Sequence, residues 1–352
     1  MVDDTSSRAN VAPRRSRRGS GAVTLHDVAR LAGVAPITAS RAVNTPQQVS
    51  ADVLRRVGDA IAQTGYVPNR LAGALASSRS RLIAAVVPTI SGTVFLETIQ
   101  SLTEALATRG YQLMLGQSGY DVRREDALLE AIIARRPDGI VLTGILHSPE
   151  GRRRLQAAGI PVVETWDLAP TPIDMLVGFS HEAVGQAVAR HLLDRGRRRL
   201  AIVSGDDERA HRRLQAFVAQ ARQHGAAGLS GEVPTVIVPA PTTLRSGRRA
   251  LAELLARDDR IDAVACSSDL LALGVMTEAQ SRGLAVPQAL AVIGFGDLEF
   301  AADLHPALSS VRINGAEIGH QAARFIVDRA EGRAVSTRIV DIGFNIVARE
   351  ST

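Results

Sequence analysis

The 352-residue sequence contains one cysteine, one tryptophan and no lysine, and only 3% of its residues are aromatic. The single cysteine, Cys266, cannot form a disulfide within the chain and fits no metal-binding spacing. Because it stands in the apolar run DAVACSS, we expect it to be a buried strand residue. No apolar stretch reaches the ~18 residues that a membrane-spanning helix needs. The first residues contain arginine and serine without the apolar centre of a secretory signal, so we expect a cytoplasmic protein.

Sequence motifs of catalysis and cofactor binding are absent as well. The sequence has no GxGxxG or Walker loop for nucleotides, and no HExxH, GxSxG or DxDxDG signature. His147 and His181 have no partner at metal-binding spacing, so we expect surface or helix-capping histidines at both positions. The sequence therefore predicts no cofactor, no metal site and no catalytic residue, which argues against an enzyme.

The stretch from Thr24 to Ser50, TLHDVARLAGVAPITASRAVNTPQQVS, has the features of a helix-turn-helix. Thr24 suits a helix N-cap because an acid stands three residues later, and apolar residues then recur at helical spacing. Gly33 ends this helix in a left-handed turn, which a residue without a Cβ adopts most cheaply. Pro36 suits the first position of a second helix, and Ser50 caps a third. We therefore predict a three-helix head.

Positive charge is concentrated at the N-terminal end. Residues 1–81 carry 12 Arg and 5 Asp, a net charge of +7, whereas residues 82–352 carry 29 Arg against 31 acids. A three-helix bundle without a special task would not need this excess. A basic bundle on a near-neutral body is typical of a domain that binds the phosphates of nucleic acid.

From residue 82 onwards, apolar runs alternate with helical stretches. We expect buried parallel strands at 82–88, 111–116, 138–144, 160–166, 199–205, 235–239, 262–268 and 290–296. Helices are expected at 95–109, 124–134, 150–158, 209–224, 244–256 and 270–281. This alternation in two blocks predicts an α/β core of two lobes, each built on a doubly wound parallel sheet.

The chain is thus expected to have four parts. They are a disordered basic arm at 1–22, the helix-turn-helix head at 23–66, a hinge at 67–81 and the two-lobed core at 82–352. Lobe 1 is expected to take residues 82–180 and 313–352, and lobe 2 residues 181–312. Gly73 makes any hinge helix marginal, so this helix would order only on DNA, although a plain linker is the alternative.

Polar side chains gather in the segments that follow the predicted strands, where doubly wound sheets bind ligands. Arg209 and Arg213 lie one turn apart just after the strand 199–205, so both can point into a cleft between the lobes. Two guanidinium groups near a helix N-terminus form an anion site, unless this side of the helix is simply solvated. Trp166 would either stack on a sugar or pack the lobes together. Ser268 and Asp269 would cap a helix, contact a ligand, or both.

Beyond these features, LHDVARLAGVAPITASRAVN, the following VS and GYVPNRLAGALAS resemble the head and hinge of the lactose repressor (LacI/GalR) family. The resemblance continues over essentially the whole chain from Val23. It implies that the helix from Pro36 to Val43 enters the major groove of an operator. It also implies base-reading roles for Pro36, Ile37 and Arg41, although the first two depart from the commoner polar or aromatic residues. The implied phosphate contacts are Thr24, Thr38, Ser40, Asn44, Ser50, Tyr66 and Asn69, and Leu75 matches the wedge that opens the minor groove.

In the core, the resemblance implies a two-lobed domain of the periplasmic-binding-protein type that binds an effector. It implies that Arg213 holds effector hydroxyls, that Ser268 contacts the effector and that Phe95 is an apolar lid. In GFGD (294–297), Gly296 stands where the family commonly has an acid, which favours an acidic effector. Asp297 is then an effector contact or a structural acid. The stretches VVPTISGTVFLE, LTGILHSP, GIPVVETWD and DMLVGFSHEA resemble the gluconate-operon repressor branch.

We therefore expect a homodimeric transcription regulator, a repressor of carbohydrate or sugar-acid genes. Its partners would be double-stranded operator DNA and a small effector, a sugar acid or a sugar phosphate. A periplasmic sugar-binding protein would share the two lobes, but it would need a signal peptide and would lack residues 24–76. An enzyme on the same lobes would need a nucleophile, a base pair or a metal cluster, and none is evident in the sequence.

Overall fold

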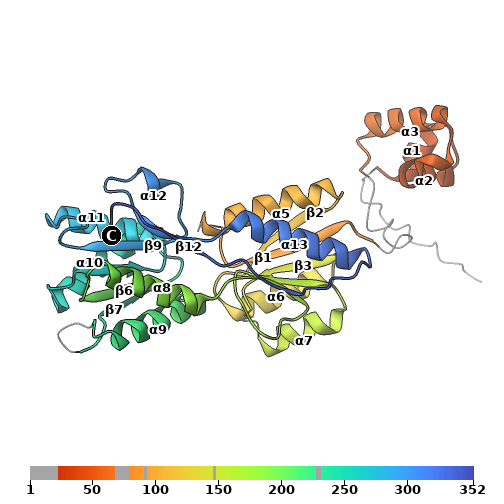
Figure 1. Cartoon of the computed structure of the whole chain (residues 1–352). Helices are drawn as coiled ribbons and strands as arrows, with labels where there is room; N and C mark the ends of the chain where they lie inside the picture. The colour runs from red at the N-terminus through yellow and green to blue at the C-terminus, as the bar shows by residue number, and fades with distance from the viewer. Residues whose placement is uncertain (1–22, 68–78, 91–92, 146–147, 227–230) are drawn as a thin grey trace, which may run out of the picture. The chain divides into compact units, whose positions relative to one another are not determined.

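Figure 1 shows the chain as a computed structural model, which describes residues 23–67, 79–90, 93–145, 148–226 and 231–352. The chain divides into two units, Met1–Ser78 and Arg79–Thr352. The predicted arm at 1–22 and most of the predicted hinge lie outside the described residues. The head and the core are therefore considered separately.

The head is the predicted three-helix bundle. Its elements are α1 (Leu25–Leu31), α2 (Pro36–Asn44), the short 3-10 helix η1 (Pro46–Gln48) and α3 (Ala51–Thr64). Apolar side chains from all three α-helices meet in one small core, in which Val28, Ala39 and Val57 are almost fully buried. Gly33 follows α1 with φ +63°, as predicted for the turn between α1 and α2.

Arg56 of α3 fixes the turn of this motif, a role that no local sequence pattern predicts. Its guanidinium donates to the carbonyl oxygen of Ala32 from Nε at 3.0 Å and from Nη2 at 2.5 Å. Nη2 also donates to the carbonyl of Gly33 at 2.8 Å. Carbonyls at the end of a short helix have no partner within the helix, so Arg56 satisfies them and holds α3 against the turn.

Lobe 1 of the core is built on a six-stranded parallel sheet in the order β11-β5-β4-β3-β1-β2. Its strands are β1 (Leu82–Val87), β2 (Gln112–Gln117), β3 (Gly139–Thr143), β4 (Val162–Thr165), β5 (Met175–Gly178) and β11 (Ile339–Asp341). Helices α5 (Leu96–Thr108) and α13 (Gly315–Ala330) pack on one face, and α6 (Val122–Ile133) and α7 (Pro149–Ala158) on the other. The short helix η2 (Thr93–Phe95) leads into α5.

Lobe 2 repeats this plan with strand order β12-β10-β9-β8-β6-β7. Its strands are β6 (Leu200–Gly205), β7 (Thr235–Val238), β8 (Ala263–Cys266), β9 (Ala291–Phe295), β10 (Ser309–Arg312) and β12 (Asn345–Val347). Helices α8 (His181–Asp194) and α9 (Glu208–Gln223) cover one face, and α10 (Leu244–Arg257) and α11 (Asp269–Ser281) cover the other. Helix α12 (Phe300–Asp303) is a single turn. Cys266 is buried in β8, as expected.

The end of the chain corrects the predicted lobe boundary, because residues 313–352 do not all belong to lobe 1. β12 pairs antiparallel with β10, with Val311 opposite Ile346, and so extends the sheet of lobe 2. The Ser351 hydroxyl then donates to the carbonyl of Val292 at 2.6 Å, and the Val292 N–H donates back to the Ser351 carbonyl at 2.8 Å. Only the part up to β11 packs in lobe 1, so the chain passes between the lobes after β5, after β10 and after β11.

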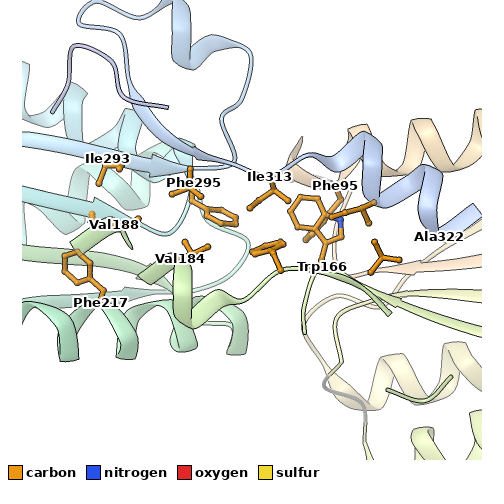
Figure 2. Packing of buried hydrophobic residues seen from close by; sticks show 14 of the residues in the cluster. Phe95, Trp166, Val184, Val188, Phe217, Ile293, Phe295, Ile313 and Ala322 are labelled. Atoms are coloured by element: carbon orange, nitrogen blue, oxygen red, sulfur yellow. The ribbon is translucent and has the colours of Figure 1, made fainter. Parts of the chain in front are cut away.

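The lobes share one apolar cluster. Figure 2 shows Phe95 and Trp166 of lobe 1 near Ile313 and Phe295, with Val184 and Val188 further into lobe 2. Phe95 and Trp166 meet edge to face with ring centroids 5.0 Å apart. This cluster places aromatic side chains beside the space between the two sheets.

The close packing of α13 on α5 supplies a test of the fold. A Cβ at Gly319 would lie 1.9 Å from Ser101 Oγ and 2.6 Å from the carbonyl oxygen of Thr98. Gly319→Ala is therefore expected to lower the unfolding free energy of the core by roughly 1–3 kcal/mol, measured by thermal unfolding of the full chain. Gly58 in α3 has no atom within 4 Å of its Cβ position, so Gly58→Ala is a control that should stabilise the head by roughly 0.5–1 kcal/mol. An unchanged core transition in Gly319→Ala would contradict this packing.

Candidate functional site

Helix α2 of the head has one buried side and one exposed side. Ala39 is fully buried, and Val43 packs against the same cluster. On the other side Ile37 is 60% exposed, and Pro36 and Arg41 are exposed as well. Within residues 23–67 the Arg41 guanidinium has no hydrogen-bond or ion-pair partner. The three side chains predicted to read bases therefore share the free face of α2.

Polar side chains flank this face at the ends of the helices. Asp27 accepts hydrogen bonds from the Thr24 N–H at 3.0 Å and from the Thr24 hydroxyl at 2.7 Å. Asn44 donates its side-chain N–H to the carbonyl of Ser40 at 3.0 Å and to its hydroxyl at 3.3 Å. These contacts fix the side chains on the helices while leaving Thr24 and Asn44 exposed to solvent.

The remaining predicted phosphate contacts differ in position. Ser50 caps α3, where its hydroxyl accepts the Val53 N–H at 3.4 Å. Thr38 is half-buried on α2, and Tyr66 is half-buried after α3 and packs against the head core. Asn69 and Leu75 lie outside the described residues. The roles predicted for these residues on DNA stay predictions.

In the core, a cavity of about 100 Å³ lies between the two lobes. It is at the carboxyl ends of the strands, near the points where the strand order reverses between β1 and β3 and between β6 and β8. Its walls include five of the residues predicted to bind the effector, namely Phe95, Trp166, Arg209, Arg213 and Ser268. The structure thus brings together residues that are up to 173 positions apart, from Phe95 to Ser268.

Arg213 is the most deeply placed cation of this cavity. Its Nη1 donates to Nδ1 of His181 at 2.9 Å, and its Nη2 to the carbonyl of Ser267 at 3.3 Å. Its guanidinium carbon lies 4.1 Å from the centre of the Phe295 ring, and its Nε is buried without a partner among the described residues. Burial lowers the pKa of Arg213 to about 10 in spite of the nearby carboxylate of Asp207. A buried cation without an ion-pair partner favours an anionic ligand.

Arg209 stands one turn before Arg213 on α9 and lines the same cavity. Its side chain is 13% exposed, and its Nε lies 3.9 Å from Oδ1 of Asp207. That carboxylate oxygen also accepts the N–H of Ala210 at the start of α9. Nη1 of Arg209 is buried without a hydrogen-bond partner among the described residues. The two arginines therefore outnumber the one acid that lines the cavity.

Arg212 points elsewhere. It forms an ion pair with Asp167, whose side chain is 1% exposed, and lies 3.4 Å from Glu182. Burial raises the pKa of Asp167 even though Arg212 opposes this shift. Arg212 therefore does not belong to a solvated helix face, because its partner at position 167 comes from the other lobe.

Hydroxyl groups complete the wall of the cavity. Thr242 and Ser268 lie 2.8 Å apart through their hydroxyl oxygens, and Tyr120 and Thr89 also line the cavity. The Ser268 hydroxyl accepts the Leu271 N–H at 3.3 Å and so caps α11. Ser268 therefore has the capping position and the cavity position that the sequence allowed. Hydroxyl groups beside two cations suit a ligand that carries both negative charge and hydroxyls.

Known proteins match this architecture over nearly the whole chain. Residues 24–69 match the bacterial regulatory proteins of the lacI family, and residues 189–352 match a periplasmic binding protein-like domain. The transcriptional regulator GntR of Pseudomonas aeruginosa is 37% identical over 96% of this chain and 98% of its own length. A LacI-family regulator from Silicibacter pomeroyi has a solved structure with a TM-score of 0.88 and 30% identity, covering 94% of this chain and 99% of that chain. GntR from Chromobacterium violaceum has a TM-score of 0.72 and 35% identity, covering 77% of this chain and 98% of that chain.

The chain belongs to the lacI family. It is a DNA-binding transcriptional regulator with a helix-turn-helix head and a periplasmic-binding-protein-like core, as the resemblance implied. The similar proteins are transcriptional regulators, which favours this assignment over the periplasmic sugar-binding protein and the enzyme. No helix within the described ranges is long and apolar enough to cross a membrane.

Two of the residues predicted to contact the effector of this LacI-family chain are placed outside the cavity wall. Asp269 is fully buried, and its carboxylate accepts the Leu298 N–H at 2.7 Å and the Ser310 hydroxyl at 2.6 Å. Burial raises its pKa to about 6. Asp297 is paired with Arg312 at 2.5 Å and with Arg349 at 2.6 Å, and its side chain is 1% exposed. The carboxylates of both acids have partners within lobe 2, which agrees with the structural role that the sequence allowed, and their contact with an effector stays a prediction.

Gly296 has a reason in the backbone. This residue has φ +121°, a backbone conformation that side chains with a Cβ rarely adopt. The backbone therefore explains the glycine by itself, and its lack of a carboxylate is no independent sign of an acidic effector. The charge of the cavity rests on Arg209 and Arg213 instead.

Two of the cavity residues that were not predicted from the sequence are His181 and Tyr120. His181 was expected at the surface or in a cap, but its side chain is 1% exposed and contacts Arg213. Burial, and then the charge of Arg213, holds the pKa of His181 well below its ordinary value. Tyr120 follows β2 in one of the segments expected at the carboxyl edge, so its position alone could have identified it. For His181 no local signal existed, since α8 itself was not predicted.

Proposed function

We propose that this regulator is a homodimeric repressor of sugar-acid genes, and that a sugar acid such as gluconate, or a phosphorylated relative, binds between its lobes. The single observation that carries the effector class is a pair of guanidinium groups, those of Arg209 and Arg213, each with a buried nitrogen that has no partner among the described residues, beside one acid. The resemblance of four stretches to the gluconate-operon repressor branch supports the same class.

The chemistry of the cavity supports a sugar acid over a neutral sugar. Guanidinium groups match the geometry of a carboxylate or a phosphate by donating two parallel hydrogen bonds. The rings of Phe95 and Phe295 lie against Arg209 and Arg213 and exclude water from one side of each. In such surroundings a charged hydrogen bond is worth more than it is in water. The hydroxyls of Thr242 and Ser268 can then bind the polyol part of the ligand.

On the DNA side, we propose that α2 of each head reads one half of a two-fold symmetric operator. Exposure of Ile37 and Arg41 on one face of α2 supports this arrangement. Arg41 can contact a guanine, whereas Ile37 offers only apolar contact, for example to a thymine methyl group. Effector binding would change the closure of the lobes and thereby the operator affinity.

Calorimetric titration tests the proposed effector class. Gluconate, 6-phosphogluconate, glucose and galactose are titrated separately into the full-length protein. A hydrogen bond to a charged group contributes roughly 1.5–3 kcal/mol, so an anionic ligand is expected to bind roughly 10–100-fold more tightly than glucose. A neutral sugar that binds more tightly than both anions would contradict the proposal. The linkage must also be reciprocal, so an effector that weakens operator binding must bind less tightly to the DNA complex.

A further inference from the structure

His181 occupies the point where the chain first passes from lobe 1 into lobe 2. It is the first residue of α8, directly after the crossover that follows β5. Its ring packs edge to face on Phe179 with centroids 4.7 Å apart, and its side chain is almost fully buried. Each ring nitrogen of His181 has one partner, and the two partners belong to different lobes.

The two partners determine the protonation of the ring. Nε2 lies 3.0 Å from the carbonyl oxygen of Trp166, which can only accept a hydrogen bond. Nδ1 lies 2.9 Å from Nη1 of Arg213, which can only donate one. The imidazole must therefore be neutral, with its proton on Nε2. A second proton on Nδ1 would remove the bond to Arg213 and place two cations in contact.

The hydrogen bonds continue into lobe 1. The Trp166 indole N–H donates to the Thr98 hydroxyl at 3.1 Å, and this hydroxyl donates to the carbonyl of Gly315 at 2.9 Å. Thr98 lies on α5 and Gly315 begins α13, the two helices that pack on one face of the lobe 1 sheet. Trp166 itself has φ +66°, which is uncommon and costly for a residue other than glycine. Its backbone is held there by the bond to His181 and by its N–H, which donates to Val177 at 3.1 Å.

We propose that His181 is a positioning residue that holds Arg213 for the effector and transmits its occupancy to Trp166 in lobe 1. An anion that binds Arg213 changes the direction and strength of the bond from Nη1 to Nδ1. Because His181 is closely packed, a shift of its ring changes the bond from Nε2 to the Trp166 carbonyl. The claim that an effector acts through His181 (the effector arm of this inference) rests on the proposed function. The claim that His181 connects the two lobes does not.

Two substitutions separate the two bonds of His181. In His181→Asn the side-chain oxygen can take the place of Nδ1 and accept from Arg213, but nothing reaches the Trp166 carbonyl. In His181→Gln the side-chain N–H₂ can take the place of Nε2 and donate to Trp166, but Arg213 loses its acceptor. Both variants lose the contact with Phe179, so each is the control of the other for loss of the ring.

The connection between lobes is tested without any effector. The chain has one tryptophan, so its NMR spectrum has one indole N–H signal. We expect Arg213→Met to displace this signal in the wild-type background and to leave it in place in the His181→Asn and His181→Gln backgrounds. Arg222→Met, an exposed change on the same helix, is the control and should not displace it. Equal displacement by Arg213→Met in all three backgrounds would overturn the inference.

A measurement on the wild-type protein covers the case in which the variants fail to fold. Nitrogen-15 spectra at neutral pH are expected to show His181 with a proton on Nε2 and none on Nδ1. An imidazole protonated on Nδ1 would overturn the inference, because it could not accept from Arg213.

Gluconate is the probe for the effector arm. In the wild type it is expected to change the operator Kd about 5–150-fold. His181→Asn should keep the gluconate Kd within about threefold of wild type, but gluconate should then change the operator Kd less than about twofold. His181→Gln should raise the gluconate Kd about tenfold, because Arg213 loses its acceptor. Wild-type coupling in both variants would overturn the inference. If gluconate fails to bind the wild type while the indole signal behaves as expected, the proposed effector is wrong and the role of His181 stands.

Discussion

The Arg41→Ala variant is expected to lose most of its specific affinity for the operator while its head stays folded. Arg41 is exposed on the face of α2 that lies opposite the buried Ala39, and within the described head its guanidinium is free to contact a base. A bidentate contact from arginine to guanine is worth roughly 1–3 kcal/mol. A homodimer would lose it in both half-sites, so operator affinity should fall between about 30-fold and about 10⁴-fold.

The measurement uses a duplex that the wild-type protein selects from random sequence, so that no operator needs to be assumed. Arg55→Ala is the matched control, because Arg55 is a 71% exposed arginine of the same head that lies on α3 and pairs with Asp52. It removes the same charge without removing a base contact from α2. The control should weaken specific and non-specific duplexes alike, as loss of a general phosphate attraction does. If Arg41→Ala keeps the base preference of the wild type, α2 does not read bases through this residue.

Local sequence patterns predicted the helices and strands that are determined by residues close together in the sequence. The head needed only capping residues, one turn glycine and helical spacing, and the eight predicted core strands are local runs in which apolar residues dominate. β5 was not predicted because its short apolar run follows a stretch with three prolines between 161 and 172, which indicates a loop. β12 is three residues long and only half-buried, and it is a strand because β10 offers an edge to it. Such pairing depends on the rest of the lobe, so no local pattern contains it.

In the candidate site, too, local features could be predicted from the sequence and features that depend on tertiary contacts could not. Arg209 and Arg213 were predicted because their spacing on one helix and the strand before them are visible in the sequence. The sequence left the role of Asp297 open because one of its partners, Arg349, lies 52 residues away, so its ion pair becomes visible only in the folded lobe. The ion pair of Arg212 could not be predicted for the same reason, since Asp167 is 45 residues away. A charged residue near a cavity has a role only once its partners are known, and those partners are determined by tertiary structure.

The Arg213→Met variant is expected to lose gluconate binding and to keep whatever weak affinity the protein has for glucose. Methionine is unbranched and fills much of the space left by the arginine, so the variant removes the charge without leaving a large cavity. Removal of one member of a buried charge pair costs roughly 2–5 kcal/mol in binding, which corresponds to about 30-fold to about 4,000-fold in Kd. A neutral sugar makes no such pair, so the preference for gluconate over glucose should shrink toward one.

Two measurements make this result specific to Arg213. Arg222→Met changes an exposed arginine of the same helix that pairs with Glu232, and it should leave both affinities unchanged. The thermal unfolding temperature of Arg213→Met should remain close to that of the wild type. The variant loses the bonds from Arg213 to His181 and Ser267, which destabilises the fold. It also removes a cation whose burial is costly, as the lowered pKa of Arg213 indicates, and this stabilisation offsets the loss. A folded Arg213→Met protein that still prefers gluconate would mean that Arg209 alone, or another part of the wall, carries the negative group of the effector. The anion would then bind near the start of α9, away from His181, and Arg213 would not be the cause of the preference for gluconate over glucose.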